Sequence, residues 1–243
     1  MIKVKKGISH IEIILAFVLF IGFVGFALFF FRPTDTSRLV DTSLIYTFDE
    51  IEKKAGVEVG EYVVKISDDI PEENINPSFR IPDIDQSSME LRVEDKNGNV
   101  IPSVKGPVFD GVGIEWIKSS GIVLIFVKSS EDYLPHLNPP NSAGIDEQYY
   151  DIISSESSRL LSERRLKEMK VEYEVDYQTL KKEFNLPGRV NFGMKVDFID
   201  DADDIMMQGT IPQGLEVFSD SKRLELLRED GTKEFVDLIV TIW

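Results

Sequence analysis

The sequence predicts an α+β protein in which a long N-terminal membrane helix precedes an antiparallel, β-rich and sandwich-like extracytoplasmic domain. Three observations lead to this fold class. Residues 13–31 form an apolar run of 19 residues without a charge. Apolar residues then recur with helical spacing as far as residue 55. From residue 57 onward the hydrophobic period changes to two, and turn residues separate the short alternating runs.

The apolar run 13–31 is long enough for one membrane helix. At helical rise it extends roughly 28 Å, about the thickness of a hydrocarbon core. A single segment can satisfy its backbone in lipid only as a helix. A cleaved secretory signal is the alternative, but no small-x-small exit site precedes Arg32-Pro33. We therefore expect a retained helix. Its aromatic stripe either contacts lipid or meets several neighbouring helices, and consists of Phe17, Phe20, Phe23, Phe26 and Phe29.

Basic residues before the apolar run predict how the chain is oriented. Lys3, Lys5 and Lys6 flank the N-terminal end, and such residues stay on the cytoplasmic side of a membrane. The sequence therefore predicts a single-pass protein of the cell membrane, with a cytoplasmic N-terminus and an extracytoplasmic C-terminal domain.

A second, amphipathic helix is expected within residues 33–56. Pro33 ends or kinks the first helix, and Gly56 follows the end of the second. Between them, apolar residues recur every three or four positions, which is typical of a helix with one buried face. These residues are Leu39, Val40, Leu44, Ile45, Phe48 and Ile51.

Residues 57–243 are expected to form the β-rich domain. Alternating runs predict strands at 57–66, 171–177 and 189–199, and helical spacing predicts helices at 154–169 and 177–184. Turn residues predict hairpins that pair 89–93 with 100–104, 112–117 with 122–127, and 224–228 with 235–242. Three hairpins separated by long loops favour a β-sandwich or an extended antiparallel sheet.

Composition excludes several classes of function. The chain carries 43 acidic against 27 basic residues, a net charge of −16, which argues against binding to nucleic acid or docking on anionic lipid. Cysteine is absent, so the chain has no disulfide, no thiol nucleophile and no zinc-thiolate site. We expect a solvated acidic surface and a fold stabilised by hydrophobic cores.

The densest acidic cluster is the segment with Asp197, Asp200, Asp201, Asp203 and Asp204. Neighbouring carboxylates can bind Ca²⁺. The spacing does not match the twelve-residue calcium loop, so a solvated acidic turn is the favoured interpretation and calcium binding stays open.

No residue pattern predicts catalysis, a metal site or a cofactor. The two histidines, His10 and His136, could not share a site with a membrane between them. Nucleophile-elbow, phosphate-loop and zinc-helix motifs are absent from the sequence. Trp116 and Trp243 are expected to pack in a core or at a sheet edge; an exposed aromatic residue could instead serve adhesion or sugar binding, without a supporting pattern. The chain is therefore not expected to be an enzyme.

The residues around the start of the apolar run are the most distinctive. Lys5-Lys6-Gly7-Ile8 is followed by Glu12, the one acidic residue at the edge of the run. This arrangement resembles the prepilin signal of type IV pilins and pseudopilins, which has a basic leader, a glycine before the cut and a glutamate at the fifth mature position. The start Ile8-Ser9-His10 departs from the bacterial pattern, and with the end Ile242-Trp243 is nearer to archaeal pilin-like proteins.

The resemblance covers residues 3–31 and implies a specific domain organisation. Residues 1–7 would be the leader peptide, 8–32 the transmembrane and filament-core helix, 33–56 the amphipathic helix and 57–243 the β-rich domain. A prepilin peptidase would cut between Gly7 and Ile8, with Lys5 and Lys6 as the leader charges.

The implied function is that of a structural subunit of a type IV pilus-like filament or a related secretion machinery. Glu12 of one subunit would pair with the new Ile8 amine of its neighbour, which relieves the cost of a carboxylate in an apolar environment. The implied partners are the prepilin peptidase, homologous pilin subunits, the membrane and, indirectly, an assembly ATPase and a platform protein. The alternative is a single-pass, membrane-anchored β-sandwich module that binds a cell-envelope or surface-layer partner.

Overall fold

The computed structural model describes residues 10–30, 34–67, 69–70, 76–82, 89–105, 111–115, 123–134, 141, 143–145, 147–199 and 204–243. Its helices are α1 (His10–Phe30), α2 (Thr34–Ala55), the 3₁₀ turn η1 (Glu147–Tyr149) and α3 (Glu163–Glu183). Its strands are β1 (Gly56–Ile66), β2 (Pro77–Arg80), β3 (Glu90–Asp95), β4 (Val100–Ile101), β5 (Ser103–Lys105), β6 (Gly111–Ile114), β7 (Val123–Ser130), β8 (Ala143–Gly144), β9 (Tyr150–Ser162), β10 (Phe192–Phe198), β11 (Ile205–Met207), β12 (Phe218–Leu227) and β13 (Lys233–Ile242).

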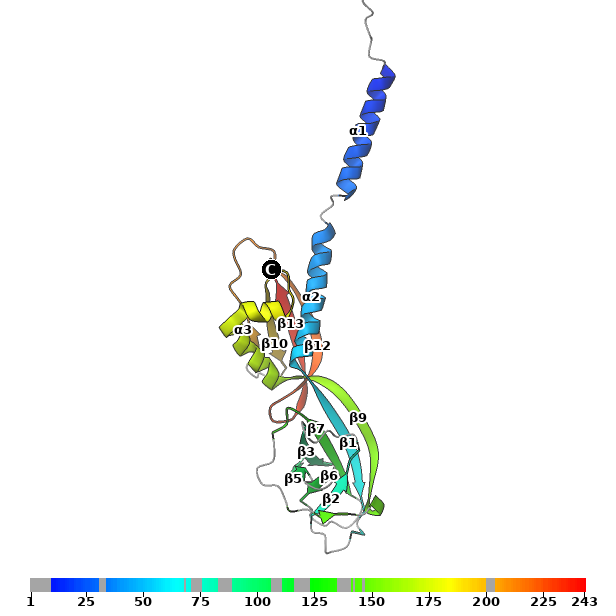
Figure 1. The fold of residues 1–243 in the computed structure, drawn as a ribbon, viewed down its shortest axis with the longest axis vertical. Coiled ribbons are helices and arrows are strands. Elements are labelled where there is room, and N and C mark those ends of the chain that lie inside the picture. Colours follow the sequence, from blue (N-terminus) through cyan, green and yellow to red (C-terminus); the bar gives the residue numbers. More distant parts are fainter. Residues whose placement is uncertain are drawn as a thin grey trace, which may run out of the picture.

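The strands form two sheets. The larger sheet has the order β11-β10-β13-β12-β9-β1-β7-β3-β4, and the smaller has the order β5-β6-β2-β8. β1 pairs with β9 along its whole length, and these two strands run from the ends of α2 and α3 to the far end of the sheet region (Figure 1). By contrast, β12 and β9 pair in parallel at only two positions, Leu226 with Leu161 and Leu227 with Ser162.

This narrow connection divides the sheet region into two lobes. We call residues 34–55 and 163–243, with α2, α3 and β10 to β13, the proximal lobe. We call residues 56–162, with β1 to β9, the distal lobe. Figure 1 shows the chain leaving the proximal lobe through β1 and returning through β9, while α1 stands clear of both sheets. The distal lobe is thus inserted between α2 and α3 of the proximal lobe.

In the proximal lobe, α2 and α3 cover one face of the strands β10 to β13. Leu44, Phe48 and Ile51 of α2 lie on one helical face and are buried in a single core with residues of all these elements. Their partners on β13 are Val236, Leu238, Val240 and Ile242, which alternate along the strand. The helix predicted from the apolar spacing is confirmed, and so is the antiparallel β12–β13 hairpin.

The distal lobe has its own core, enclosed by the far halves of β1 and β7 and by the smaller sheet. Val64 and Ile66 of β1, Ile125 of β7, and Phe79 and Ile114 of the smaller sheet are all buried there. Burial of such side chains contributes about 1.5–3 kcal/mol each. Within the described residues, the chain therefore folds around two large hydrophobic cores. A smaller buried cluster lies between them at the junction of the lobes and consists of Val57, Val59, Tyr133, Leu160 and Leu227.

The fold class predicted from the sequence is wrong and is corrected here. Within the described residues, none of the helices combines the length and the hydropathy needed to cross a bilayer. The helical residues before the sheets are divided between α1 and α2. Instead of two antiparallel sheets packed as a sandwich, most strands join one curled nine-stranded sheet, because the end of β9 pairs with β12 and so links the strands of the two lobes. Each sheet also contains a parallel pair.

Three local predictions also fail. The predicted hairpin of 112–117 with 122–127 does not form, because β6 belongs to the smaller sheet and β7 to the larger. The first part of the helix predicted at 154–169 is strand β9, and the strand predicted at 171–177 is part of α3. The strands predicted at 57–66 and 189–199, and the hairpin between β3 and β4, are confirmed.

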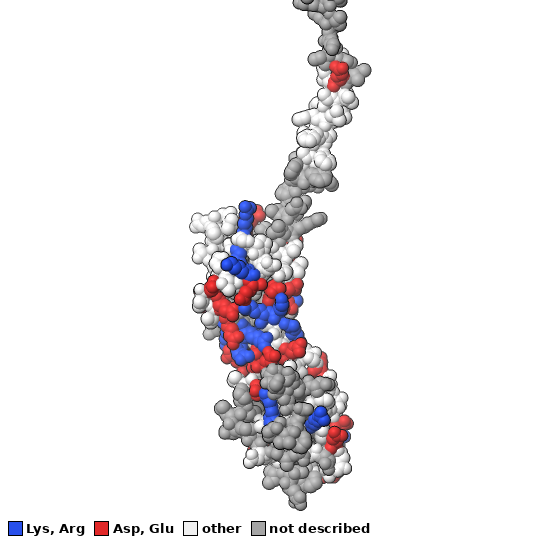
Figure 2. Space-filling model, viewed as in Figure 1, with Lys and Arg blue, Asp and Glu red and all other residues white. Residues whose placement is uncertain are grey.

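Polar contacts connect the two lobes where β1 and β9 leave the proximal lobe. Figure 2 shows side chains of both charges gathered on the proximal lobe next to this junction. Arg165 of α3 donates from Nη1 to the Gly56 carbonyl oxygen over 2.8 Å and from Nη2 to the Glu131 carboxylate over 2.6 Å. Asp132 accepts hydrogen bonds from Ser162 and Arg164. The junction thus ties the end of β7 to the beginning of α3.

Candidate functional site

The candidate assembly surface is the apolar side of α1. Ten of its large apolar side chains are more than half exposed, from 52% for Ile21 to 70% for Phe23. They are Ile13, Ile14, Leu15, Phe17, Val18, Leu19, Phe20, Ile21, Phe23 and Phe26. Contiguous apolar surface of this extent marks a site of contact with another molecule or with lipid.

Glu12 lies in the first turn of α1 and is exposed. A carboxylate in this position is stabilised by the partial positive charge at the helix N-terminus. The next eight residues whose side chains the structure describes, Ile13 to Phe20, are uncharged and exposed. Glu12 is therefore an isolated negative charge at one end of an apolar rod.

The other residues assigned to the leader and the cut lie outside the described residues. These are Lys5, Lys6, Gly7 and Ile8. His136 and Trp116 lie outside them as well, whereas His10 is exposed at the start of α1. Of the predicted site residues, the structure thus places Glu12.

The acidic segment is described only in part. Asp197 on β10 and Asp204 both contact Lys195, whose Nζ lies 3.3 Å from Asp197 Oδ1 and 2.8 Å from Asp204 Oδ2. The hydrogen bond from Lys195 lowers the pKa of Asp204, and the two carboxylates raise the pKa of Lys195. No cluster of three potential metal ligands occurs among the described residues. Lys195 thus offsets part of the negative charge of these two aspartates.

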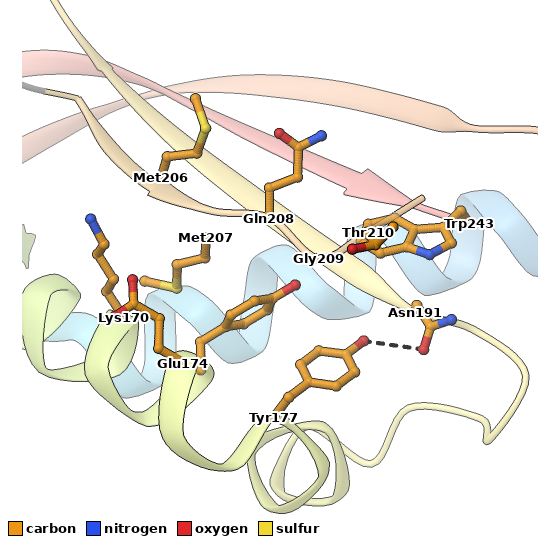
Figure 3. A pocket seen from close by; sticks show the side chains of 11 residues that line it. Lys170, Glu174, Tyr177, Asn191, Met206, Met207, Gln208, Gly209, Thr210 and Trp243 are labelled. Carbon is orange, nitrogen blue, oxygen red and sulfur yellow. Dashed lines mark hydrogen bonds between the residues drawn. The ribbon is translucent and has the colours of Figure 1, made fainter. Parts of the chain in front are cut away.

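A pocket of about 610 Å³ opens in the proximal lobe between α3, β11 and the segment after it, and the last residue of the chain (Figure 3). Trp243 lies over two glycines. A Cβ atom added at Gly193 or Gly209 would lie 3.4 Å from the six-membered ring of the indole. A Cβ on Gly193 would also lie only 2.9 Å from the Met207 carbonyl oxygen. The indole therefore lies close to the backbone at both positions, and Gly193 is required by the approach of the Met207 carbonyl oxygen.

Tyrosines of α3 form the inner wall of this pocket. Tyr173 donates to the Phe192 carbonyl oxygen over 2.8 Å, and its ring lies edge-on to those of Tyr177 and Phe192. Burial, with a smaller contribution from Tyr177, raises the pKa of Tyr173 to about 12. The hydroxyl is therefore protonated at neutral pH and stays a hydrogen-bond donor.

The side chain of Asn191 is fixed by the same network. The Tyr177 hydroxyl donates to Asn191 Oδ1 over 3.3 Å, as drawn in Figure 3, and Lys181 Nζ donates to the same oxygen over 3.1 Å. Burial lowers the pKa of Lys181. With Oδ1 occupied in this way, the amide nitrogen of Asn191 remains as a donor at the pocket.

Sequence reasoning missed this pocket because it assigned Tyr173 and Tyr177 to a strand. Their spacing of four residues was the available signal, since residues i and i+4 share a helix face. Tyr173 and Tyr177 lie on the inner side of α3, and Val171 and Val175 on the outer side are 59% and 81% exposed.

Comparisons of the chain with protein-family models, with curated proteins and with solved structures gave no match.

Proposed function

We propose that this chain is a structural subunit of a type IV pilus-like filament or of a related secretion machinery, and that it assembles through α1. One observation carries the proposal. The exposed carboxylate of Glu12 lies in the first turn of an apolar helix whose large side chains are exposed. Catalysis is not needed for this role. The partners would be homologous subunits, a prepilin peptidase, and indirectly an assembly ATPase and a platform protein.

The exposed side chains of α1 provide the contact surface of the filament. Once the subunit has left the membrane, each large apolar side chain that is covered by a neighbour and kept out of water stabilises the filament by about 1.5–3 kcal/mol. The phenylalanines of the aromatic stripe lie on several faces of α1. Packing the α1 helices of several subunits side by side would cover all of these faces. The sheets are uninvolved in this contact, because α1 stands clear of them (Figure 1).

Glu12 gives the assembly its register. Cleavage after Gly7 would create a positive amine on Ile8, four residues before Glu12. Pairing of this amine with Glu12 of a neighbour would remove an isolated charge from the apolar bundle, whereas an unpaired carboxylate there is costly. Subunits shifted along the filament axis would lose the pair.

The proposed location follows from the same role. Before assembly the subunit would reside at the cell membrane, with its basic N-terminus in the cytoplasm and its two lobes outside. After assembly it would be part of a surface filament.

A Glu12→Gln variant tests the proposal. The amide keeps the size of the side chain but cannot pair with an amine as an ion. We expect the variant to be cut normally, with Ile8 as the first residue in N-terminal sequencing, and to stay in the membrane fraction. Its amount in filaments sheared from cells should fall at least tenfold.

Asp49→Asn is the matched control, because Asp49 is an exposed acidic residue on α2. It should assemble like the unmodified chain. If Glu12→Gln is recovered in filaments at the control level, the pairing of Glu12 with the Ile8 amine is wrong. If the unmodified chain keeps residues 1–7 in the cell, or is absent from the sheared filaments, the filament proposal is wrong. Absence of the unmodified chain from filaments would instead support a membrane-anchored binding module.

A further inference from the structure

We propose that the proximal lobe binds a neutral sugar ring, as part of a glycan, in the pocket beside Trp243. The proposal concerns a site remote in sequence from α1 and does not depend on filament assembly. Its volume, about 610 Å³, lies within the range of ligand pockets, roughly 300–1,000 Å³.

The first argument is the flat aromatic surface. The indole of Trp243 lies close to the backbone at Gly193 and Gly209, two positions without a side chain. Figure 3 shows it at the end of the pocket, on the other side from Tyr177 of α3. A fixed aromatic ring offers an apolar surface at low entropic cost. The apolar C–H face of a pyranose ring matches such a surface.

The second argument is the set of hydrogen-bonding groups at the rim. Lys170 and Glu174 of α3, and Gln208 and Thr210 after β11, line the pocket. In the part of the chain that the structure describes, no hydrogen bond or ion pair engages their side chains. With the Asn191 amide they supply both donors and acceptors. A sugar ring carries hydroxyl groups that are each both donor and acceptor, so it can hydrogen-bond with all of these side chains. A purely apolar ligand would leave the donors and acceptors of the rim without partners.

The third argument is the charge. The rim carries one cation, Lys170, and one anion, Glu174, so its own charge is balanced. The chain as a whole has a net charge of −16, which repels anionic ligands. A neutral sugar fits both conditions better than a phosphate or a uronic acid does.

The tyrosine hydroxyls of the inner wall already have hydrogen-bond partners within the protein, so they maintain the shape of the pocket. Tyr173 and Tyr177 use their hydroxyls on Phe192 and Asn191 within the protein. They are positioning residues, which set the depth of the pocket and the orientation of the Asn191 amide. The groups that meet the ligand are then Trp243, Asn191 and the four side chains at the rim.

Fluorescence can test this inference directly. The chain has two tryptophans, so Trp116→Phe leaves Trp243 as the only tryptophan, whose emission can be excited selectively over that of the tyrosines. We would titrate the full chain, in a detergent without a sugar headgroup, with methyl glucoside, methyl mannoside and N,N′-diacetylchitobiose. We expect a saturable change of Trp243 emission with at least one of these sugars. Saturation-transfer NMR should show contact to the ring C–H protons.

Two sets of variants localise the binding. Trp243→Ala should weaken sugar binding at least tenfold by NMR, and the double variant Gln208→Leu with Thr210→Val should do the same while it keeps the aromatic platform. Phe235→Ala is the matched control, because Phe235 is a 56% exposed aromatic residue outside the pocket, and it should bind like the unmodified chain.

Three results would overturn the proposal. These are no saturable binding of any of the three sugars, binding that is unchanged in the Gln208 and Thr210 double variant, and tighter binding of tetramethylammonium than of every sugar. The last would identify the site as an aromatic cage for a cation. Because the subunit is assayed unassembled, failure here leaves the filament proposal unaffected, and failure of Glu12→Gln leaves this one unaffected.

Discussion

Glu94 on β3 is a buried carboxylate held between two cations. Its oxygens lie 2.6 Å from Arg92 Nε and 2.7 Å from Lys128 Nζ. Burial disfavours the charged form of Glu94, but hydrogen bonds from Lys128 and Arg92 outweigh burial, so the pKa lies below its usual value of 4.5. The folded state therefore binds this proton less readily than the unfolded state does.

The sign of the resulting pH dependence is fixed. For a lowered pKa, the stabilisation is complete above pH 4.5 and is lost as the pH falls below 4.5 through the pKa of the folded state. We expect Glu94→Gln to lower the free energy of unfolding at pH 7 by about 1–2 kcal/mol, since two charge-assisted hydrogen bonds are weakened. Below pH 4.5 the difference between the variant and the unmodified chain should shrink as the pH falls towards the pKa of Glu94 in the folded state.

Urea unfolding of the full chain at pH 7 and pH 3.5 measures both effects. Glu156→Gln, at an exposed glutamate on β9, is the control and should follow the unmodified chain at both pH values. An equal loss of stability for Glu94→Gln at pH 7 and pH 3.5 would show that the residue acts through packing and not through its charge.

At the scale of elements, the β12–β13 turn makes a close contact across the lobes. Gly231 has φ = +84°, and a Cβ atom there would lie 2.8 Å from Arg92 Nη1. Arg92 itself donates to the Asp230 carbonyl oxygen. The turn thus needs glycine for two reasons, its backbone conformation and the approach of Arg92.

Gly98 allows the effect of backbone conformation to be measured without that of a close neighbour. It has φ = +82° in the β3–β4 turn, with no described atom within 4 Å of an added Cβ. Gly98→Ala should cost about 1 kcal/mol through the backbone alone, and Gly231→Ala about 2 kcal/mol or more. The comparison is made by chemical unfolding of the full chain. In an Arg92→Ala background the two costs should become equal; if Gly231→Ala keeps its excess there, the Arg92 contact is not its cause.

Elements with one clear hydrophobic period could be predicted from the sequence, and others could not. α2, β1 and β13 each bury a single face, so their spacing identified them. β9 has no such face from Ile153 to Ser157, which are all exposed, and its conformation depends on pairing with β1. A sequence shows periodicity but not the presence of a partner strand.

In α3 two periods compete. Val171, Tyr173, Val175 and Tyr177 alternate with polar residues, which predicts a strand. Leu166, Met169, Tyr173 and Leu180 at helical spacing are the residues that the core buries. The helical run is also interrupted at Asp176, which has φ = −145° and accepts hydrogen bonds from Thr179 as the cap of the following turns. This cap explains why two separate segments were predicted.

The assembly surface on α1 and the pocket beside Trp243 also differ in how far the sequence predicts them. Glu12 and the apolar run are contiguous in sequence, so a local motif was enough to single them out. The pocket joins residues of α3, of the segment after β11 and of the chain end, and Trp243 meets Gly193 and Gly209 only in the folded lobe. Long-range convergence of this kind leaves no local pattern.

At the scale of the whole molecule, stability depends on how two cores are coupled. The lobes are connected by β1 and β9, by the two-residue contact of β12 with β9, by the apolar cluster around Leu227, and by polar contacts around Asp132. The side chain of Asp132 is only 2% exposed. It accepts from the hydroxyl of Ser162, which is the N-cap residue of α3, and from both Arg164 and Arg165. One distal carboxylate therefore positions the first turn of a proximal helix.

Removing this carboxylate should uncouple the lobes. Asp132→Ala leaves the Ser162 hydroxyl and the two arginines without their shared acceptor. The cost should be about 2 kcal/mol, below that of a fully buried ion pair because Arg164 is half exposed and can turn to water. Scanning calorimetry of the full chain should show one transition for the unmodified protein and two for the variant, since each core keeps its own contacts.

Asp151→Ala, at an exposed aspartate on β9, is the control and should leave a single transition. A single transition at an unchanged temperature for Asp132→Ala would mean that β1 and β9 alone couple the two cores.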